Sequence, residues 1–459
     1  MNMILDIGFS FLDVMLKERT MSMKILLVRP YYFSKLGNLE PLSLEYLGGL
    51  LKSLKIPYAY HDEYQYPIFN RKQRLIKRVI KEEFDWVGFS ANASGTDYIL
   101  SVCTAIKRLN PSIKTIIGGV VAELNPKELM KDPVDVIYYD NGLSSFKTLC
   151  LHAQDQQAWE TIPGISYQEN GQWVTHKKSP PINDFLVRPD RDPFYKYLDR
   201  NFIIFKGSHA LMKTSFSCPH DCSFCCCRIL NDGVYTERSL DDVIDEIKSI
   251  DHKRIWFIDD SFTLNTQRVI DFCHRIINEK IDKRFACYSR ADFVTSHPDL
   301  LPLMYKAGIR DLSIGLESAD DETLDDYHKH ISSTDNETAI RLLNENGITC
   351  TGLFVISPKA TRASFRKLIR FIRKNNLLYV AFAVFTAYKG TEAYEEYKDK
   401  IIRYDSKVLD NYHLTMKPEA MSSFEFMLRM WSLYALTYPR ILVRYLFKTA
   451  DQPLRRGWI

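Results

Sequence analysis

Short apolar runs alternate with amphipathic stretches between residues 23 and 153. The apolar runs have the length of buried strands, and the stretches between them have the apolar spacing of helices. This alternation predicts a parallel sheet wrapped by helices, the doubly wound (Rossmann-like) α/β class, with ligands at the carboxyl ends of the strands. The predicted strands are 24–28, 86–89, 115–117 and 136–139, and the predicted helices are 42–54, 76–83 and 96–109.

A second alternating series follows between residues 210 and 397. Its six predicted strands are each preceded or followed by a helical pattern, which predicts a partial (β/α)6 barrel. A turn at Glu169–Gly171 and several prolines mark the chain between the two series as a connector. The predicted organisation is an N-terminal extension (1–22), a doubly wound domain (23–153), a connector (154–209), a partial barrel (210–397) and a helical C-terminal region (398–459). The predicted barrel strands are 211–214, 254–258, 285–288, 311–314, 352–355 and 379–386.

Composition narrows the class of protein. Hydrophobic residues make up 46% and charged residues 26%, as in soluble globular chains, and Lys plus Arg (61) exceed Asp plus Glu (57) too slightly to indicate nucleic acid as a partner. Residues 1–20 are apolar but contain Asp6 and Asp13, and their apolar run is shorter than the ~20 residues of a spanning helix. We therefore expect a cytoplasmic protein without a signal peptide.

Five of the ten cysteines lie within residues 218–227, which indicates metal chemistry in a reducing compartment. Cys218, Cys222 and Cys225 form a CxxxCxxC pattern directly after the first predicted barrel strand. A structural zinc site is the alternative; it needs four closed ligands, which Cys226, Cys227 or His220 could in principle complete. Three thiolates on a four-iron cube instead leave one iron free to chelate S-adenosylmethionine (SAM). The simplest interpretation of Cys226 and Cys227 is that they are small buried hydrophobes.

The cysteine pattern after a first barrel strand resembles the radical SAM superfamily, and later segments match that family in order. The resemblance implies a [4Fe–4S] cluster on the three cysteines and SAM contacts at the strand ends. Taken singly, each strand-end group could equally be a salt bridge or a cap. The SAM-binding residues that the resemblance implies are Phe224, beside the adenine, Asp259 and Asp260, near the SAM amino group, Ser289 and Arg290, and Glu317 in a Gly-x-Glu segment.

Segments 41–47, 87–90 and 117–120 resemble the cobalamin-binding domain that precedes many radical SAM barrels. Glycines at the carboxyl end of a strand let the backbone approach a bulky ligand such as the corrin and its nucleotide tail. The sequence has no Asp-x-His-x-x-Gly element, so we expect no histidine ligand to cobalt, and residues 140–143 stand where relatives usually carry an acidic loop. The implied cobalamin-binding residues are Ser90, Asn92, Gly118, Gly119 and Val120.

The resemblance implies a cobalamin-dependent radical SAM methyltransferase that acts on an unactivated carbon of a small-molecule or lipid-like substrate through a 5′-deoxyadenosyl radical. A cyclisation, rearrangement or oxidation with the same cofactors is the first alternative, and a non-catalytic iron–sulfur or corrinoid sensor is the second. An external electron donor of the flavodoxin or ferredoxin type and a monomeric state are expected.

The C-terminal region carries Arg440, Arg444 and Lys448 at spacings of four after Pro439, which suits the first position of a helix. A basic amphipathic helix of this kind can lie on the cytoplasmic face of a membrane. The interpretation that we favour is a helix that docks on the core and turns a charged face to solvent, because most packed surface helices are amphipathic.

Overall fold

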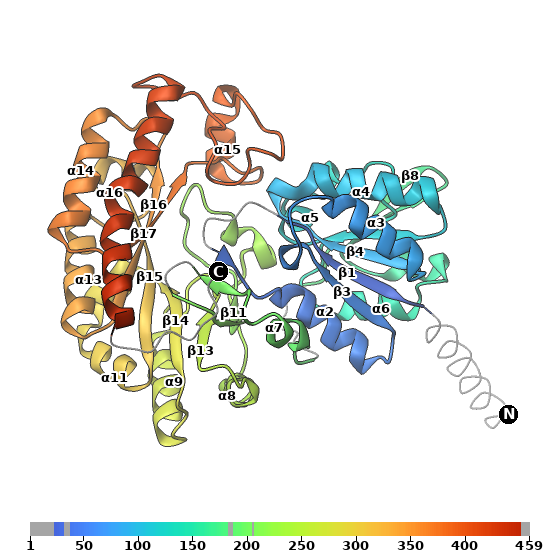
Figure 1. Cartoon of the computed structure of the whole chain (residues 1–459), viewed down its shortest axis with the longest axis horizontal. Coiled ribbons are helices and arrows are strands. Elements are labelled where there is room, and N and C mark those ends of the chain that lie inside the picture. Colours follow the sequence, from blue (N-terminus) through green and yellow to red (C-terminus); the bar gives the residue numbers. More distant parts are fainter. Residues whose placement is uncertain (1–22, 32–36, 182–186, 204–205, 451–459) are drawn as a thin grey trace. The chain divides into compact units, whose positions relative to one another are not determined.

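The computed structural model describes residues 23–31, 37–181, 187–203 and 206–450, and the predicted extension 1–22 lies outside them. Two compact units are present (Figure 1): residues 1–34 with 41–200, and residues 35–40 with 201–459. Among the described residues, no helix has the length and apolar character needed to cross a membrane.

The first unit is built on a seven-stranded sheet in the order β3-β1-β4-β5-β6-β7-β8. The pairings from β3 to β6 are parallel, and β7 and β8 add antiparallel strands at one edge. Two buried clusters lie on opposite faces of the sheet, one with α3, α4 and α5 and the other with α2 and α6 (Figure 1). The predicted doubly wound fold is confirmed. In sheet order the strands are β3 (Tyr58–Asp62), β1 (Ile25–Arg29), β4 (Trp86–Ser90), β5 (Lys114–Gly118), β6 (Val136–Tyr138), β7 (Ile165–Glu169) and β8 (Gln172–Thr175), and the helices are α2 (Leu42–Ser53), α3 (Arg71–Lys81), α4 (Thr96–Leu109), α5 (Val120–Leu124), α6 (Ser144–Leu151) and α7 (Asp192–Lys196).

Two features of this unit differ from the sequence interpretation. Strand β3 was not predicted, because its sequence YAYHD lacks the apolar run of the other strands and it lies at a sheet edge. The turn that the sequence predicts in the connector joins β7 to β8. This hairpin extends the first sheet through antiparallel pairing of β7 with β6. Most of the predicted connector therefore belongs to the first unit.

The second unit contains a parallel six-stranded sheet in the order β10-β13-β14-β15-β16-β17, the order of the chain. Each strand returns to the sheet beside its predecessor, as in a (β/α) barrel, with β10 and β17 at its two edges. The predicted partial barrel is confirmed. The strands are β10 (Ala210–Met212), β13 (Arg254–Phe257), β14 (Arg284–Ser289), β15 (Ile309–Glu317), β16 (Thr349–Ile356) and β17 (Tyr379–Val384), and the helices are α8 (Leu240–Ser249), α9 (Thr266–Asn278), α10 (Ala291–Ser296), α11 (Leu301–Lys306), α12 (Asp321–Asp326), α13 (Ser333–Glu345), α14 (Arg362–Lys374), α15 (Glu392–Tyr397) and α16 (Ser423–Ala450).

Polar caps fix where the outer helices of the barrel begin. Ser239 and Asn265 accept hydrogen bonds from the first turns of α8 and α9. Ser332 and Thr361 form reciprocal capping boxes at α13 and α14. Each cap satisfies backbone N–H groups that a helix start leaves unpaired, which sets the strand-to-helix turns.

A short segment before α2 belongs to the barrel unit. Strand β2 (Gly37–Asn38) pairs antiparallel with β9 (Phe202–Ile203), and the Glu40 carboxylate accepts a hydrogen bond from the backbone N–H of Leu211 in β10. Gly37 has φ +123°, and a Cβ there would lie 2.1 Å from the Phe202 carbonyl oxygen. Only glycine allows this close pairing.

The C-terminal helix differs from its prediction. Helix α16 begins at Ser423, and Pro439 lies inside it, so the prediction that a helix starts at Pro439 is wrong. A proline interrupts one backbone hydrogen bond, to the carbonyl four residues earlier. That carbonyl belongs to the exposed Ala435, where water can replace the missing donor.

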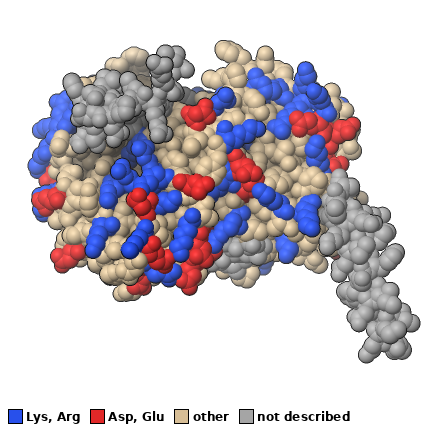
Figure 2. Space-filling view, turned by 60° about the horizontal axis from the view of Figure 1, so that its bottom comes forward, with Lys and Arg blue, Asp and Glu red and all other residues tan. Residues whose placement is uncertain are grey.

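Basic and acidic side chains are interspersed on the face shown in Figure 2. This mixture agrees with the small excess of 61 Lys and Arg over 57 Asp and Glu in the whole chain.

Candidate active site

The three motif cysteines lie in a loop that follows strand β11 (Ser215–Phe216). Ser217 turns the chain with φ +61°. Ser223 then pins the loop to the end of α12, because its N–H donates to the Tyr327 carbonyl at 3.2 Å and its Oγ donates to the Asp326 carbonyl at 3.1 Å. These two hydrogen bonds hold the middle of the loop against the end of α12.

The described thiols do not form a ready site for a single metal ion. Among the described residues, no three His, Cys, Asp or Glu side chains converge on one metal position. Thiolates around one zinc each lie ~2.3 Å from it, whereas thiolates at separate corners of a four-iron cube stand farther apart. Burial raises the pKa of Cys218 to about 11, so bare thiolates are unfavourable here and metal binding has to displace the protons.

Arg290 lies against this loop. Its Nη1 is 3.8 Å from the Cys222 sulfur, its Nη2 donates to the Lys329 carbonyl at 2.8 Å, and its Nε donates to Asp292. A guanidinium at a cysteine sulfur stabilises negative charge on the cluster it would hold. Arg290, which the sequence predicts to contact SAM, therefore also contacts one of the three motif cysteines.

Asp259 is completely buried and holds the start of the cysteine loop. Its carboxylate accepts hydrogen bonds from the N–H of Thr214 at 2.6 Å, the Thr214 hydroxyl at 2.5 Å and the N–H of Ser215 at 3.0 Å. Burial raises the pKa of Asp259, and these donors counteract only part of that effect. The carboxylate is occupied by its own backbone, so we assign Asp259 a positioning role in place of the predicted SAM contact.

Asp260, the next residue, has a carboxylate oxygen that makes no hydrogen bond among the described residues. Its Oδ2 is buried without a hydrogen-bond partner among the described residues, and Lys213 Nζ is 3.5 Å away. Its charge also acts on Cys218 and Cys225. The carboxylate is ion-paired with Lys213, and its Oδ2, which makes no hydrogen bond among the described residues, can accept one from an ammonium group such as that of SAM.

Glu317 ends β15 in a buried ion pair that the sequence did not reveal. The Lys329 Nζ lies 2.9 Å from its Oε1, and both side chains are buried. Burial acts to lower the pKa of Lys329, but the adjacent Glu317 carboxylate and Cys222 outweigh it and raise that pKa. A Cβ at Gly315 would lie 2.3 Å from Glu317 Oε1 and 2.8 Å from Lys329 Nζ, so a larger residue there would displace this ion pair.

Replacing Lys329 with methionine is expected to lower the free energy of unfolding of the barrel by about 3–5 kcal/mol, because Glu317 is left buried without its cation. Urea denaturation of the cofactor-free chain would measure the loss. The double variant Lys329→Met/Glu317→Gln removes the isolated charge and should recover most of it. Equal stability of wild type and Lys329→Met would show that the pair is not formed.

The other two predicted SAM residues have partners within the barrel. The Ser289 hydroxyl is 2.7 Å from the Thr263 hydroxyl, and the ring centroid of Phe224 is 5.0 Å from that of Tyr327. Phe224 also packs on a buried cluster that includes Phe385. Their contacts with SAM stay predictions.

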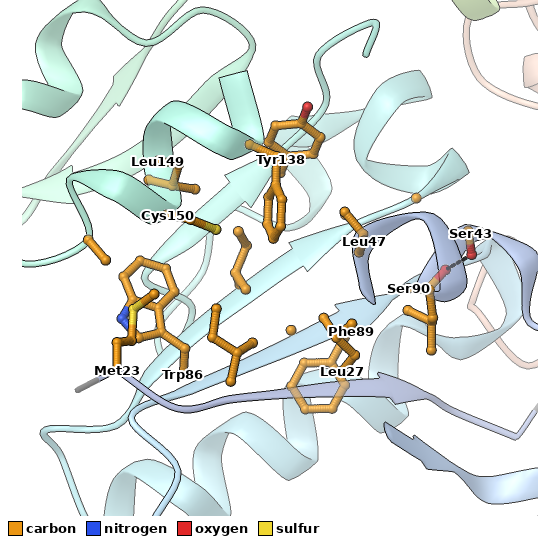
Figure 3. A pocket seen from close by; sticks show the side chains of 18 residues that line it. Met23, Leu27, Ser43, Leu47, Trp86, Phe89, Ser90, Tyr138, Leu149 and Cys150 are labelled. Carbon is orange, nitrogen blue, oxygen red and sulfur yellow. Dashed lines mark hydrogen bonds between the residues drawn. The ribbon is translucent and has the colours of Figure 1, made fainter. Parts of the chain in front are cut away.

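An apolar cavity of about 180 Å³ lies in the first unit between the sheet, α2 and α6. Trp86, Leu149 and Cys150 line one end of the cavity. Ser90, the last residue of β4, and Ser43, in the first turn of α2, line the other end, with their hydroxyls 3.3 Å apart (Figure 3). Protein cores rarely leave voids of this size. A mostly apolar slot with a few polar groups at one end is typical of a cofactor site.

Three glycines, Gly88, Gly118 and Gly119, line this cavity, and the last two are among the residues that the sequence predicts to bind cobalamin. Gly119 has φ +101°, and a Cβ there would lie 2.5 Å from the Ala91 carbonyl oxygen, so the turn from β5 into α5 requires glycine. Gly118 and Ser90 also line the cavity, which places three of the predicted residues together. The flat, apolar parts of cobalamin fit such a slot.

The remaining predicted cobalamin residues are placed differently. Asn92 caps the short helix Ala93–Gly95, with its Oδ1 accepting from the Ser94 N–H at 3.1 Å, and Val120 is 43% exposed in the first turn of α5. Neither lines the cavity. Asp140, in the segment where relatives carry an acidic loop, accepts hydrogen bonds from Ser145 and Ser179 and so ties this loop together.

Two protein-family models match the chain along its two units. Residues 33–149 match the B12 binding domain, and residues 212–372 match the radical SAM superfamily. The first range contains most of the residues that line the cavity, and the second contains the cysteine loop, Asp259, Asp260, Arg290 and Glu317.

Individual proteins are similar to this chain over most of its length. An uncharacterized methyltransferase of Pyrococcus horikoshii is 28% identical over 81% of this chain and 83% of its own length. The anaerobic magnesium-protoporphyrin IX monomethyl ester cyclase of Rubrivivax gelatinosus is 26% identical over 90% of this chain and 77% of its own length. Among solved structures, the radical SAM methyltransferase TsrM from Kitasatospora setae, with cobalamin and a [4Fe–4S] cluster bound, superimposes with a TM-score of 0.65 at 17% identity, over 79% of this chain and 75% of that one, and so shares the fold.

The cofactors of the two domains are SAM with a [4Fe–4S] cluster in the barrel and cobalamin in the first unit. The expected radical SAM chemistry and cobalamin binding are confirmed at the level of domains. The chain is therefore an enzyme of the radical SAM superfamily with an N-terminal B12-binding domain.

Proposed function

We propose that the protein transfers a methyl group to an unactivated carbon of a small-molecule or lipid-like substrate. The observation that supports this proposal is the presence in one chain of the apolar cavity beside Gly118 and Gly119 and of the three-thiol loop of the barrel. When bound, the reduced cluster with SAM supplies a 5′-deoxyadenosyl radical, and cobalamin supplies a methyl carrier.

The chain's own residues bind and orient these groups. Cys218, Cys222 and Cys225 hold the cluster, and three ligands leave one iron for SAM. Asp260 accepts from the SAM ammonium, while Glu317 and its partner Lys329 form a charged pair at the end of β15. Asp259 keeps the loop in place through Thr214 and Ser215. Reduction by an external flavodoxin- or ferredoxin-type donor and function as a monomer belong to the same proposal.

A cyclisation, rearrangement or oxidation is the second candidate function, favoured by the likeness to the Rubrivivax cyclase. The two candidates predict different products. Methyl transfer yields 5′-deoxyadenosine together with S-adenosylhomocysteine, whereas a cyclase or rearrangement reaction yields 5′-deoxyadenosine alone.

The holoenzyme, reconstituted anaerobically with iron, sulfide and cobalamin, is tested with a strong reductant and SAM whose methyl group is deuterated. Separate lipid and water-soluble extracts supply candidate substrates. Labelled methyl in a product, with both nucleosides released, is expected. Deoxyadenosine with substrate conversion but no label would overturn methyl transfer in favour of the cyclase alternative. Neither nucleoside from a protein with an intact cluster would contradict both and favour a sensor.

A further inference from the structure

Helix α16 turns an apolar stripe to solvent. Phe424, Leu428 and Trp431 are 80%, 59% and 54% exposed, and Leu436 and Val443 continue along the helix. The first three have the spacing i, i+4, i+7, which places them on one face. Leu436 and Val443 lie about 100° further round the helix, so only Phe424, Leu428 and Trp431 are called the apolar stripe below.

The opposite face of α16 is apolar as well. Phe426, Met430, Leu433 and Ile441 are buried, and Phe426 packs edge-on against Phe365 of α14. A surface helix of a globular protein normally presents polar residues to water, and a helix that is apolar on both faces normally has a partner on both. The barrel covers one face of α16.

The charged side chains described on α16 do not lie on the stripe. Glu425 pairs with Arg362 of α14 and with Arg429, and Arg440 donates to Asn376 Oδ1 at 2.7 Å. The predicted basic face is thus only partly described, because the side chains of Arg444 and Lys448 lie outside the described ones. The described part of the solvent face is apolar and not charged.

A row of cations runs beside the stripe. The Arg362–Glu425 and Asn376–Arg440 contacts show that α14 lies alongside α16 in the same direction. Arg366, Arg370 and Arg373 of α14 are exposed, and among the described residues none has an acidic partner. Residues 362–374 and 423–450 together contain ten Lys and Arg and one Glu. These three arginines are called the cationic row.

We propose that the apolar stripe and the cationic row bind the surface of an anionic lipid bilayer, with α16 lying along the interface. Apolar side chains including a tryptophan bury in the headgroup region while adjacent arginines contact lipid phosphates. A second copy of the chain fits less well, because two facing copies would bring like-charged rows together. This inference is independent of the reaction and of the substrate.

The test measures co-sedimentation of the anaerobically purified holoenzyme with vesicles of phosphatidylcholine, with and without phosphatidylglycerol. Binding is expected only to the anionic vesicles and should weaken as salt is raised. The variants Leu428→Ser/Trp431→Ser and Arg366→Glu/Arg373→Glu should each lower the partition coefficient by about tenfold or more.

The matched control is Arg108→Glu/Leu109→Ser, which makes the same kinds of change at exposed positions of α4 and should bind as the wild type does. Iron content and thermal melting show that each variant is folded. Equal binding by wild type and both α16/α14 variants would overturn the proposal, as would no binding to anionic vesicles. A wild-type dimer in light scattering that Leu428→Ser/Trp431→Ser converts to a monomer would instead assign the stripe to a second copy.

Discussion

The Cys222→Ala variant is expected to purify without a [4Fe–4S] cluster and to form no 5′-deoxyadenosine. Two thiolates would remain for a cube that needs three, and Arg290, 3.8 Å from the missing sulfur, would face no sulfur charge. Loss of a residue that merely supports a metal ligand costs about 10- to 100-fold, so loss of a ligand should cost more. Iron and sulfide analysis, with chromatography of the nucleosides, measures both effects.

Cys226→Ala is the matched control, because Cys226 lies in the same loop but outside the CxxxCxxC pattern. It should retain the iron and the deoxyadenosine formation of the wild type. Full iron content in Cys222→Ala, with iron lost from Cys226→Ala, would show that another set of thiols holds the metal.

The Cys150→Trp variant is expected to exclude cobalamin while keeping its iron–sulfur cluster. Cys150 lines the apolar cavity from α6, and an indole there would occupy much of its 180 Å³. Because the side chain grows into a void instead of a packed core, the usual overpacking cost of about 1–3 kcal/mol should be largely avoided. Cobalamin affinity should fall more than about tenfold, a change of at least 1.4 kcal/mol.

Equilibrium dialysis of cobalamin against the cluster-loaded protein measures this affinity. Leu151→Trp, the next residue of α6, is the control, because its side chain is 37% exposed and does not line the cavity. Its affinity should match that of the wild type. Undiminished cobalamin binding by Cys150→Trp, in a folded protein, would place the cofactor elsewhere.

Much of the fold could be predicted because apolar runs and helical periodicity report burial directly. All six barrel strands lie within a few residues of their predicted positions, and α4 has the predicted bounds. The cysteine loop could be predicted equally well, because the spacing of its cysteines is contained in a short stretch of sequence. Strand β3 was missed because an edge strand with partly exposed tyrosines does not form an apolar run.

The site's side-chain partners could not be predicted, because they are distant in sequence. Nothing near Glu317 indicates that Lys329 neutralises it, and nothing near Asp259 indicates that Thr214 and Ser215 saturate its oxygens. Both carboxylates stand at strand ends, where a free group and a structural group have the same sequence pattern. The Oδ2 of Asp260, by contrast, is buried and has no hydrogen-bond partner among the described residues.

Helix α16 shows a further limit of sequence periodicity. The spacing of Arg440, Arg444 and Lys448 suggested a charged solvent face, but Arg440 turns to Asn376 and the exposed positions are Phe424, Leu428 and Trp431. When most positions of a helix are apolar, the sequence pattern still predicts that a helix forms. It no longer shows which face of that helix packs on the barrel.

The short β2 segment has a consequence for dividing the protein into pieces. Residues 35–40 precede most of the first unit in the chain, yet Gly37 and Asn38 pair with β9, and Glu40 holds the backbone of β10. A fragment that starts at residue 201 would lack the partner of its first strand and the acceptor for Leu211. The barrel unit is therefore not one continuous piece of the chain, and a cut at residue 201 separates it from residues with which it pairs.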